Sequence, residues 1–322
     1  MTTLKTKQVK FVYHNEDLSE LESYFSENHI FPIEKYRLLY DRLISEKVLA
    51  PDNVISPLEL SLDDLAIVHD KAYIKKLKIR SQFQKRFFWM GKENPISKEN
   101  IRLQSIICDG SYKAAQLALA HRVGIHLGGG FHHAKKDSAS GFCIFNDVSF
   151  AAKKLLLENI VSQVMVIDCD VHQGDGTAKI FEGDDSVYTF SIHQQDNFPH
   201  LKERSDCDVG LFSNEIVTDK LYLESLKFLS YLVNTKKPNI IFYIAGADPF
   251  IGDRLGGFKL SKEGLLARDK FVFKVSGKTP VVLVLGGGYS EDVSDVVDIH
   301  FNTVKEAVSH YKNGGLLSFL KI

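Results

Sequence analysis

The sequence predicts one α/β domain built on a mainly parallel β-sheet with helices on both faces. Short apolar runs without strict alternation recur along the chain, which is typical of strands buried on both faces. Helical patterns lie between several of these runs, and such alternation favours a parallel sheet. The 322 residues, 44% of them hydrophobic, are enough to bury a large single core.

The predicted strands are six apolar runs rich in valine and isoleucine. Each run stops at a glycine or a polar residue, which predicts the end of the strand. The runs occupy residues 10–14 (KFVYH), 123–130 (VGIHLGGG), 164–170 (VMVIDCD), 187–193 (VYTFSIH), 240–248 (IIFYIAGAD) and 281–288 (VVLVLGGG).

The predicted helices have apolar residues at helical spacing. They occupy residues 32–46, 61–77, 146–159 and 219–235. The second begins with SLDD, in which a serine cap and acidic residues in the first turn favour the start of a helix.

Composition and charge exclude several classes of protein. Forty basic and 41 acidic residues leave a net charge of -1, so no general attraction to nucleic acid or to an acidic membrane is expected. No run approaches the roughly 18 apolar residues that span a bilayer, and the first residues lack the apolar segment of a secretory signal. Four irregularly spaced cysteines predict neither a disulfide framework nor a CxxC metal site. We therefore expect a cytoplasmic protein with no nucleic-acid or membrane partner.

Acidic and imidazole side chains gather where the predicted strands end, which is where parallel α/β sheets bind ligands. Asp168, Asp170 and His172 alternate, so an extended chain points all three to one side. Asp170 and His172, joined by Asp248 from another strand end, would hold a divalent cation that offsets the repulsion between the carboxylates. Three protein ligands leave a position for water, as in catalytic sites. Such ligands favour Zn²⁺, with Fe²⁺ or Co²⁺ as competitors.

Other residues at the strand ends supply acid–base groups. His132 and His133 follow a glycine run, and a metal-activated water needs a base. Asp168 and Asp175 are spare carboxylates that could set histidine tautomers. Tyr289 could donate its hydroxyl to an oxyanion. The alternatives are that the aspartates are turn or capping residues and that Tyr289 is a packed aromatic. The coincidence of these groups after several strands disfavours both alternatives.

As a set, these residues resemble the zinc-dependent histone deacetylase family, which has the arginase/deacetylase fold. The matching motifs follow the family's order: GGGFHHAKKDSASGFCIFND (128–147), DCDVHQGDGT (168–177), SIHQ (191–194), GADP (246–249) and LGGGYS (285–290). Residues 29–43 and 61–77 look like the N-terminal helices of bacterial and class IV-like members. The resemblance covers about residues 10–312. It implies one catalytic domain over residues 1–322, with about eight strands.

Two departures from the family pattern concern the middle of the chain. Many relatives have Gly-Gly-Thr at a helix start where this chain has CDGS (108–111). The region from Ser81 to Gln104 has no counterpart in the pattern. Both departures bear on the choice of substrate and leave the expected chemistry intact.

The resemblance implies a role for each matching residue. Asp170, His172 and Asp248 match the metal ligands, and Tyr289 matches the tyrosine that polarises the scissile carbonyl. His132 and His133 match the family's tandem histidines. Asp168 would stand behind His132, and Asp175 behind His133. A structural K⁺ would be bound by the side chains of Asp168 and Ser191 and by the carbonyls of Asp170, His172 and Ile192. The substrate channel would be lined by Gly141, Phe142, Phe198, Gly287 and Gly288.

The implied reaction is metal-dependent hydrolysis of an Nε-acyl-lysine amide in a protein or peptide, with an acetyl or longer acyl group. The metal would polarise the carbonyl and activate water. We expect His133 to be the base and acid, and His132 to be an electrostatic partner held by Asp168. Hydroxamate-type inhibitors are expected to bind. A small acylated amine, such as an acetylpolyamine, presents the same amide and is the alternative substrate. A eukaryotic source would also permit a nuclear location.

Two other readings of the sequence are less consistent with these motifs. An arginase-like ureohydrolase with two metal ions would need further carboxylates, yet Gly174 stands two residues after His172 and the tandem histidines have no role there. A catalytically silent acyl-lysine binder would lack the base, a ligand or the tyrosine, and none of these is missing.

Overall fold

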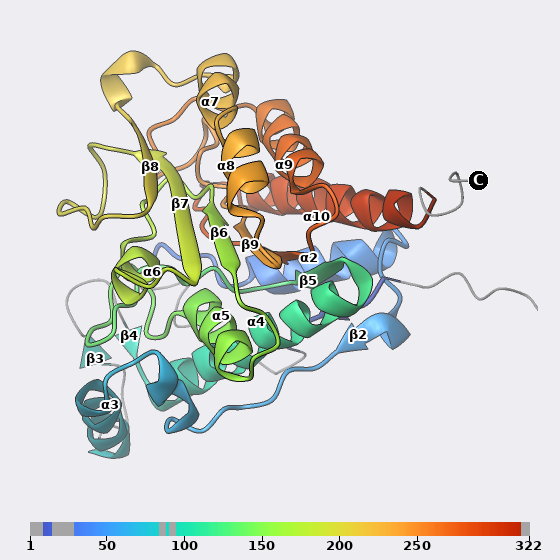
Figure 1. Ribbon diagram of the computed structural model, residues 1–322. Coiled ribbons are helices and arrows are strands. Elements are labelled where there is room, and N and C mark those ends of the chain that lie inside the picture. Colours follow the sequence, from blue (N-terminus) through green and yellow to red (C-terminus); the bar gives the residue numbers. More distant parts are fainter. Residues whose placement is uncertain (1–8, 15–28, 84–87, 90–94, 317–322) are drawn as a thin grey trace, which may run out of the picture.

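The computed structural model describes residues 9–14, 29–83, 88–89 and 95–316 (Figure 1). Among these residues, eight strands form one sheet in the order β2-β1-β5-β10-β9-β6-β7-β8, and every pairing in it is parallel. The predicted parallel sheet of about eight strands is therefore confirmed. The predicted single domain, residues 1–322, includes segments that lie outside the described residues.

All six predicted apolar runs contain a strand. The sheet consists of β1 (Phe11–Val12), β2 (Val54–Ile55), β5 (Val123–His126), β6 (Val164–Asp168), β7 (Val187–Gln194), β8 (Cys207–Leu211), β9 (Ile240–Ile244) and β10 (Val281–Val284). A separate antiparallel pair is formed by β3 (Phe88–Trp89) and β4 (Pro95–Ile96). The two strands of the sheet that the sequence did not predict, β2 and β8, lie at its edges. An edge strand is only partly buried, so β8 lacks the continuous apolar run of a central strand.

The helices form a layer on each face of the sheet (Figure 1). The α-helices are α2 (Lys35–Ser45), α3 (Lys71–Phe83), α4 (Lys98–His121), α5 (Asp147–Leu157), α6 (Asp175–Ile180), α7 (Asp219–Leu226), α8 (Leu229–Lys236), α9 (Lys262–Ser276) and α10 (Val293–Leu316). Three 3₁₀ turns are η1 (Pro51–Asn53), η2 (Asp64–Ile67) and η3 (Ser213–Glu215). Helices α4 and α5 pack together on one face, and α10 packs on α2 and α9 on the other.

The two layers enclose separate hydrophobic clusters, one on each face of the sheet. In β9, Ile241 and Tyr243 belong to the cluster that includes α9 and α10. Ile240 and Phe242 belong to the cluster that includes α4 and α5. Successive side chains of a strand point to opposite faces, so a strand covered on both faces is apolar at every position. This explains why the sequence shows continuous apolar runs.

Two predicted helices are interrupted in the structure. The segment 61–77 forms η2 and then α3. Between them, the His69 ring makes tertiary hydrogen bonds. Its Nδ1 lies 2.9 Å from the carbonyl oxygen of Lys135, and its Nε2 accepts the Asn146 N–H at 3.2 Å. The segment 219–235 forms α7 and α8, which a short turn at residues 227–228 separates.

The CDGS segment (108–111) lies inside α4 and not at a helix start. Helix α4 begins instead after Ser97, whose hydroxyl accepts the Asn100 N–H at 3.0 Å. The segment is buried against the sheet, where Ser111 hydrogen-bonds to His126 on β5 at 3.0 Å. The small residues of CDGS therefore allow a helix to pack closely on a strand.

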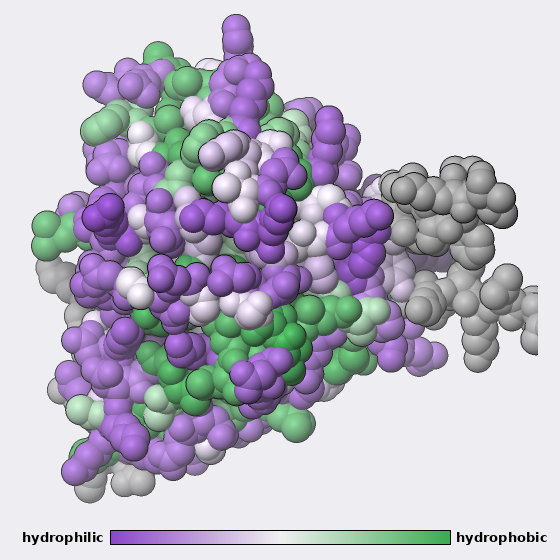
Figure 2. Space-filling model, viewed as in Figure 1, coloured by the Kyte–Doolittle hydropathy of each residue, from purple (hydrophilic) through white to green (hydrophobic). Residues whose placement is uncertain are grey.

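The molecular surface is mostly hydrophilic on the face that Figure 2 shows, with an apolar area over the α4 and α5 region. Leu157 at the end of α5 and Ile160 just after it are exposed, at 57% and 48% of their surface. Among the residues that the structure describes, no helix combines the length and the apolar character needed to cross a bilayer.

Candidate active site

Four neighbouring strands of the sheet lead into the loops that carry the predicted metal ligands, the tandem histidines and Tyr289. Strands β5, β10, β9 and β6 are adjacent in that order, and they are parallel. Their carboxyl ends therefore meet at one edge, as expected for the ligand site of such a sheet. The loops after these strands carry the tandem histidines, Tyr289, Asp248 and the aspartates of the DCDVH motif.

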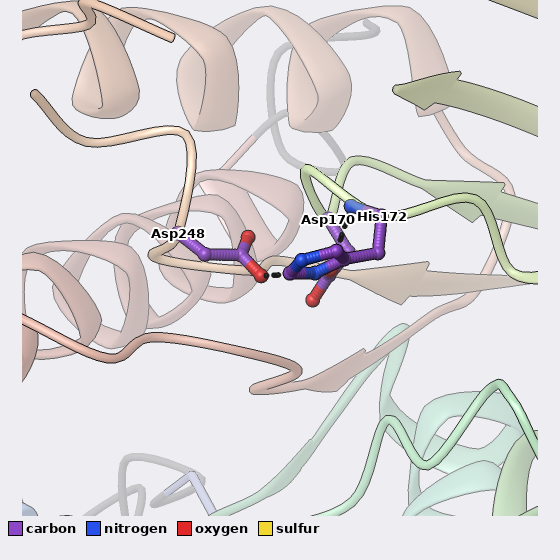
Figure 3. Close-up of side chains that lie close together, drawn as sticks. All are labelled: Asp170, His172 and Asp248. Atoms are coloured by element: carbon purple, nitrogen blue, oxygen red, sulfur yellow. Dashed lines mark hydrogen bonds and ion pairs between the residues drawn. The ribbon is translucent and has the colours of Figure 1, made fainter. Parts of the chain in front are cut away.

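Asp170, His172 and Asp248 form the candidate metal centre (Figure 3). One potential ligand atom from each residue lies within 4.8 Å of the other two, and all three residues are buried. The Nδ1 atom of His172 lies 3.1 Å from Asp170 Oδ1 and 3.2 Å from Asp248 Oδ2. Among the described residues, this is the one cluster of His, Cys, Asp and Glu side chains close enough to hold a metal ion.

Backbone N–H groups hold the two carboxylates in place. Asp170 accepts the Gly287 N–H at 2.7 Å, and Asp248 accepts the Val171 N–H at 2.9 Å. Since ligand orientation depends on such contacts, both carboxylates are preorganised. Gly287 was predicted from the sequence only as a channel residue.

The electrostatics of this cluster suit a cation. Burial and the nearby Asp170 charge raise the pKa of Asp248 to about 8. Burial opposes the charged form of His172, but the two carboxylates outweigh it and raise its pKa to about 10. A proton on His172 thus balances the carboxylates in the metal-free protein. A divalent cation would supply that positive charge and release the proton, so the donor set fits such an ion.

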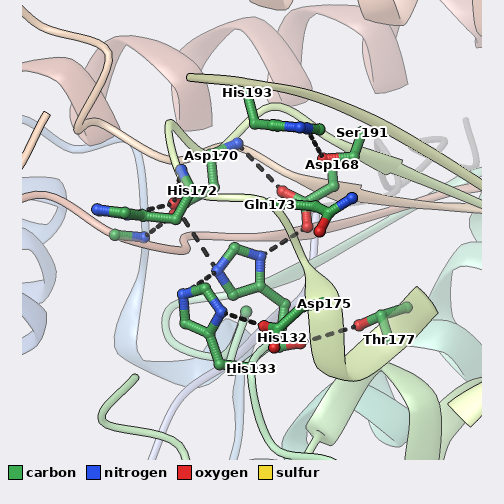
Figure 4. A network of polar contacts seen from close by, with 12 residues as sticks. His132, His133, Asp168, Asp170, His172, Gln173, Asp175, Thr177, Ser191 and His193 are labelled. Carbon is green, nitrogen blue, oxygen red and sulfur yellow. Dashed lines mark hydrogen bonds and ion pairs between the residues drawn. The ribbon is translucent and has the colours of Figure 1, made fainter. Parts of the chain in front are cut away.

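The tandem histidines each face a buried carboxylate (Figure 4). His132 Nδ1 lies 2.6 Å from Asp168 Oδ2, and His133 Nδ1 lies 2.7 Å from Asp175 Oδ1. The two Nε2 atoms are 3.1 Å apart. Because a carboxylate can only accept, each Nδ1 carries a proton, and the Nε2 atoms are directed toward the pocket and each other.

The two imidazoles differ in charge. Burial disfavours the cation of His132, but the charges of Asp168 and Asp170 outweigh burial and raise its pKa to about 9. Burial and the charge of His132 lower the pKa of His133 to about 4. Near neutral pH, His132 is therefore an imidazolium whose Nε2–H donates to the neutral His133.

Asn146 and Asp147 fix the backbone that carries the histidines. Asp147 Oδ1 accepts the Phe131 N–H at 2.7 Å, and the Asn146 side-chain amide donates to the His132 carbonyl at 3.2 Å. Gly130 has a φ of +87°, and a Cβ there would lie 2.6 Å from Gly286 N, so the loop approaches the β10 loop closely. Asn146 and Asp147 lie in the IFND part of the matching motif and had no role predicted from the sequence.

Tyr289 lies on the wall of the same pocket. Its ring is 6.2 Å from the His172 ring and 5.8 Å from the Phe142 ring. The backbone N–H of Tyr289 donates to Asp253 at 2.6 Å, and Arg254 donates to its carbonyl at 3.0 Å. Burial raises the pKa of the Tyr289 phenol well above its ordinary value, so the hydroxyl keeps its proton. Asp253 and Arg254 were not identified from the sequence.

A narrow pocket lies between these groups. Its lining includes His132, His133, Asp170, Tyr289, Gly141, Phe142, Gly287, Phe31 and Phe131. Phe198 stands beside it, with its ring 4.9 Å from the His133 ring. Gly288 faces the core instead, since a Cβ there would meet Val296 and Ala247.

A buried lysine lies beneath the pocket and was also missed. Lys35 Nζ donates to the Gly286 carbonyl at 2.9 Å and lies 4.9 Å from the centre of the Phe31 ring. Burial lowers its pKa to about 8. A single lysine in the segment 29–43 carries no sequence signal that distinguishes it from a surface residue.

The residues predicted to bind K⁺ lie on β6, β7 and the loop after β6. Asp168 and Ser191 are register partners on the two paired strands. Asp168 Oδ1 accepts the Asp170 N–H at 3.1 Å, and Ser191 Oγ lies 2.9 Å from His193 Nδ1. The predicted main-chain ligands, the carbonyls of Asp170, His172 and Ile192, belong to the same two segments.

The sequence of this chain matches one family profile and several bacterial proteins over most of its length. Residues 29–304 match the family profile described as a histone deacetylase domain. An uncharacterized protein of Picosynechococcus is 36% identical over 292 residues, which cover 90% of this chain and 95% of that protein. The acetoin utilization protein AcuC of Staphylococcus aureus is 31% identical over 295 residues, covering 84% of this chain and 75% of that protein.

Solved structures agree with the predicted arginase/deacetylase fold. The crystal structure of the HDA15 HD domain superposes with a TM-score of 0.77 at 22% identity, covering 88% of this chain and 84% of that one. An HDAC homolog complexed with SAHA has a TM-score of 0.78 at 23% identity, covering 94% of this chain and 84% of that one. At this level of identity the likeness concerns the fold.

Proposed function

The chain belongs to the histone deacetylase family and is a hydrolase of the deacetylase type, and from this premise we propose that it removes an acetyl or longer acyl group from the side-chain amine of acyl-lysine in proteins or peptides. The observation that carries this proposal is the convergence of three kinds of group on one narrow pocket. These are the Asp–His–Asp cluster, two histidine–aspartate pairs and a buried tyrosine.

Asp170, His172 and Asp248 would hold the divalent cation on which this family depends. We propose Zn²⁺, with Fe²⁺ or Co²⁺ as competitors, because the donor set is two carboxylates and one imidazole. When bound, such an ion supplies Lewis-acid polarisation of the amide carbonyl and lowers the pKa of a water molecule. Asp168 and Ser191, with the carbonyls of Asp170, His172 and Ile192, would hold a K⁺ beside it.

His133 would take the proton from the attacking water. It is neutral because its pKa is about 4, and with its Nδ1–H directed to Asp175 it has a lone pair on Nε2. In the structure that lone pair accepts the His132 Nε2–H at 3.1 Å, and His133 lines the pocket beside Asp170 and Tyr289. The attacking water would replace His132 as its partner. A base must be deprotonated at the working pH and within reach of the water. Near neutral pH His133 is deprotonated at Nε2, whereas His132 is protonated there.

His132 would act as a fixed positive charge and support the proton transfer to the leaving amine. Its pKa of about 9 keeps it protonated near neutral pH, and its Nε2 lies 3.1 Å from His133 Nε2. As His133 gains a proton from water, repulsion from His132 makes that proton easier to pass to the amine nitrogen. The pair would therefore deliver the proton that the lysine product needs.

Tyr289 would stabilise the negative charge that develops on the carbonyl oxygen. Its phenol stays protonated, and its backbone is held from both sides by Asp253 and Arg254. A fixed donor of this kind acts more strongly in a dry pocket than in water.

The channel would admit an unbranched acyl-amine side chain. Gly141, Phe142 and Gly287 line the pocket, and Phe198 stands at its side against His133. Aromatic walls suit the methylene groups of lysine. Hydroxamates, which combine a metal-binding end with a linear chain, would bind in the same place.

We also propose that the chain acts as one catalytic domain in the cytoplasm. All four cysteines are free, and three of them are buried, which fits a reducing compartment.

The test of this function is a substrate screen with purified, metal-loaded protein. Fluorogenic lysine peptides with acyl chains of increasing length would be compared with acetylated polyamines. We expect hydrolysis of the lysine peptides with the higher kcat/KM. Preference for the polyamines would replace the proposed substrate by the small-amine alternative, and no hydrolysis of any of them would contradict the proposal.

Asp170→Asn provides the matched control for that screen. Loss of one anionic ligand should abolish metal retention, and activity should disappear with it. Elemental analysis of the purified variant measures this directly. A variant with full metal content would show that Asp170 is not a ligand.

A further inference from the structure

Arg268 on α9 is the largest fully buried side chain among the described residues. It forms an ion pair with its neighbour Asp269, in which both Nε and Nη2 lie 2.9 Å from Oδ1. A buried ion pair is often no more stabilising than apolar residues of similar volume. The presence of an arginine at this position therefore points to a contribution other than core stability.

The guanidinium connects the two loops that carry the candidate aspartate ligands. Arg268 Nη1 donates to the Gly246 carbonyl at 2.6 Å and to the Cys169 carbonyl at 3.3 Å. Cys169 directly precedes Asp170, and Gly246 stands two residues before Asp248. One side chain thus fixes both loops, on the side away from the pocket.

The Gly246 peptide lies in close contact with both ligands. A Cβ at this position would lie 2.7 Å from Asp170 Oδ2 and 2.7 Å from Asp248 Oδ1. Rotation of this peptide would therefore push against one or both carboxylates. The hydrogen bond from Arg268 to its carbonyl opposes that rotation.

Asp269 is itself held from two other elements. Its Oδ1 accepts the Tyr243 hydroxyl at 2.5 Å, and its Oδ2 accepts the Thr303 hydroxyl at 2.6 Å. Tyr243 belongs to β9 and Thr303 to α10, so strand, helix and arginine are joined in one buried network. Every member of the network is less than 2% exposed.

We propose that Arg268 is a positioning residue for the metal centre. By holding the Cys169 and Gly246 carbonyls, it keeps Asp170 and Asp248 at the separation that a divalent cation requires. This inference rests on the proposed function only in taking Asp170, His172 and Asp248 as ligands. Loss of an outer contact of this kind typically weakens metal affinity by about 10–100-fold.

The experiment is a metal titration of the Arg268→Met variant, which keeps the length of the side chain and loses its donors. Metal-free protein would be titrated with Co²⁺ in competition with a chromophoric chelator, and the visible absorption of bound Co²⁺ would be recorded. We expect an affinity about 10–100-fold below that of the parent and an altered spectrum. Arg268→Lys should recover part of the affinity, because it keeps one donor and the charge.

Leu265→Ala on the same helix is the matched control, because Leu265 is an equally buried apolar residue. It should lower the urea midpoint of unfolding and leave Co²⁺ affinity unchanged. Parent-like affinity and spectrum in Arg268→Met would overturn the proposal. An equal loss of affinity in Leu265→Ala would also overturn it, because general destabilisation would then be the cause.

Should Arg268→Met fail to fold, Arg268→Gln replaces it, because its shorter neutral side chain loses the charge and the forked guanidinium. An affinity and spectrum equal to those of the parent would then overturn the proposal. The ratio between the Co²⁺ affinities of variant and parent is measured without any catalytic turnover of substrate. A parent protein that binds Co²⁺ but hydrolyses no acyl-lysine would contradict the proposed function and leave this comparison valid.

Discussion

His132 and His133 are adjacent in the chain and have almost the same local geometry. Each directs its Nδ1 atom to a buried carboxylate, at 2.6 Å for Asp168 and 2.7 Å for Asp175. Yet the pKa is raised to about 9 for His132 and lowered to about 4 for His133. The contact with an aspartate is therefore not what separates their roles.

The difference comes from the next neighbours of each pair. His132 Nε2 lies 3.7 Å from a second carboxylate, that of Asp170. Asp175, in contrast, also has the ammonium group of Lys135 at 3.2 Å, which offsets part of its charge. A buried imidazole near two carboxylates stays charged, whereas one near a compensated carboxylate and another cation stays neutral.

His133→Ala should have the largest effect on activity. Removal of the proposed base should lower kcat by about a thousandfold or more, within the range of general acid–base catalysis. Metal content and the binding of a hydroxamate should persist, because the candidate ligands are untouched. His132→Ala is the control, and a larger loss of kcat there than in His133→Ala would reverse the assignment of the base.

Tyr289→Phe should lower kcat by about a hundredfold, through loss of one oxyanion donor worth about 2.7–4 kcal/mol. Both histidine pairs stay intact in this variant, so the pH profile should keep its shape while its height falls. Steady-state kinetics across pH would measure both features. An unchanged rate would remove Tyr289 from the mechanism.

Lys135→Met should produce a smaller effect, which is visible mainly in the pH profile. Without the ammonium group, the full charge of Asp175 would favour protonated His133 and raise its pKa. Since the neutral form is the base, the acid limb of kcat/KM should move to higher pH. Lys136→Met, at the exposed neighbouring position, is the control. Identical acid limbs in the two variants would show that Lys135 does not set the charge of His133.

The smallest expected change is that of the parent enzyme between about pH 7.5 and pH 6. An imidazole with an ordinary pKa of about 6.5 would lose about three quarters of its neutral form at the lower pH. A pKa of about 4 leaves His133 neutral over this whole range, so the rate should stay nearly constant at saturating metal. A severalfold fall in kcat/KM would indicate an ordinary histidine as the base.

The central strands were predictable because a strand that is buried on both faces has apolar residues at every position, which gives a continuous apolar run in the sequence. Strand β8 was not, because an edge strand is half exposed. Most candidate site residues were also predictable from the sequence, because they stand directly after predicted strands and ligand sites of parallel sheets lie where the strands end. Asp253 and Lys35 were missed because their contacts, to Tyr289 and to Gly286, join segments 36 and 251 residues apart.

The sequence by itself determined which residues stand at or just after the ends of the strands, but the chain bends at residues 170–172, so the alternation of Asp168, Asp170 and His172 did not decide how their side chains meet. Only the tertiary structure decided the sheet order that places β5, β10, β9 and β6 side by side. It also decided which histidine is charged. Burial and Coulomb interactions depend on distances through space, and the order of residues along the chain does not contain those distances.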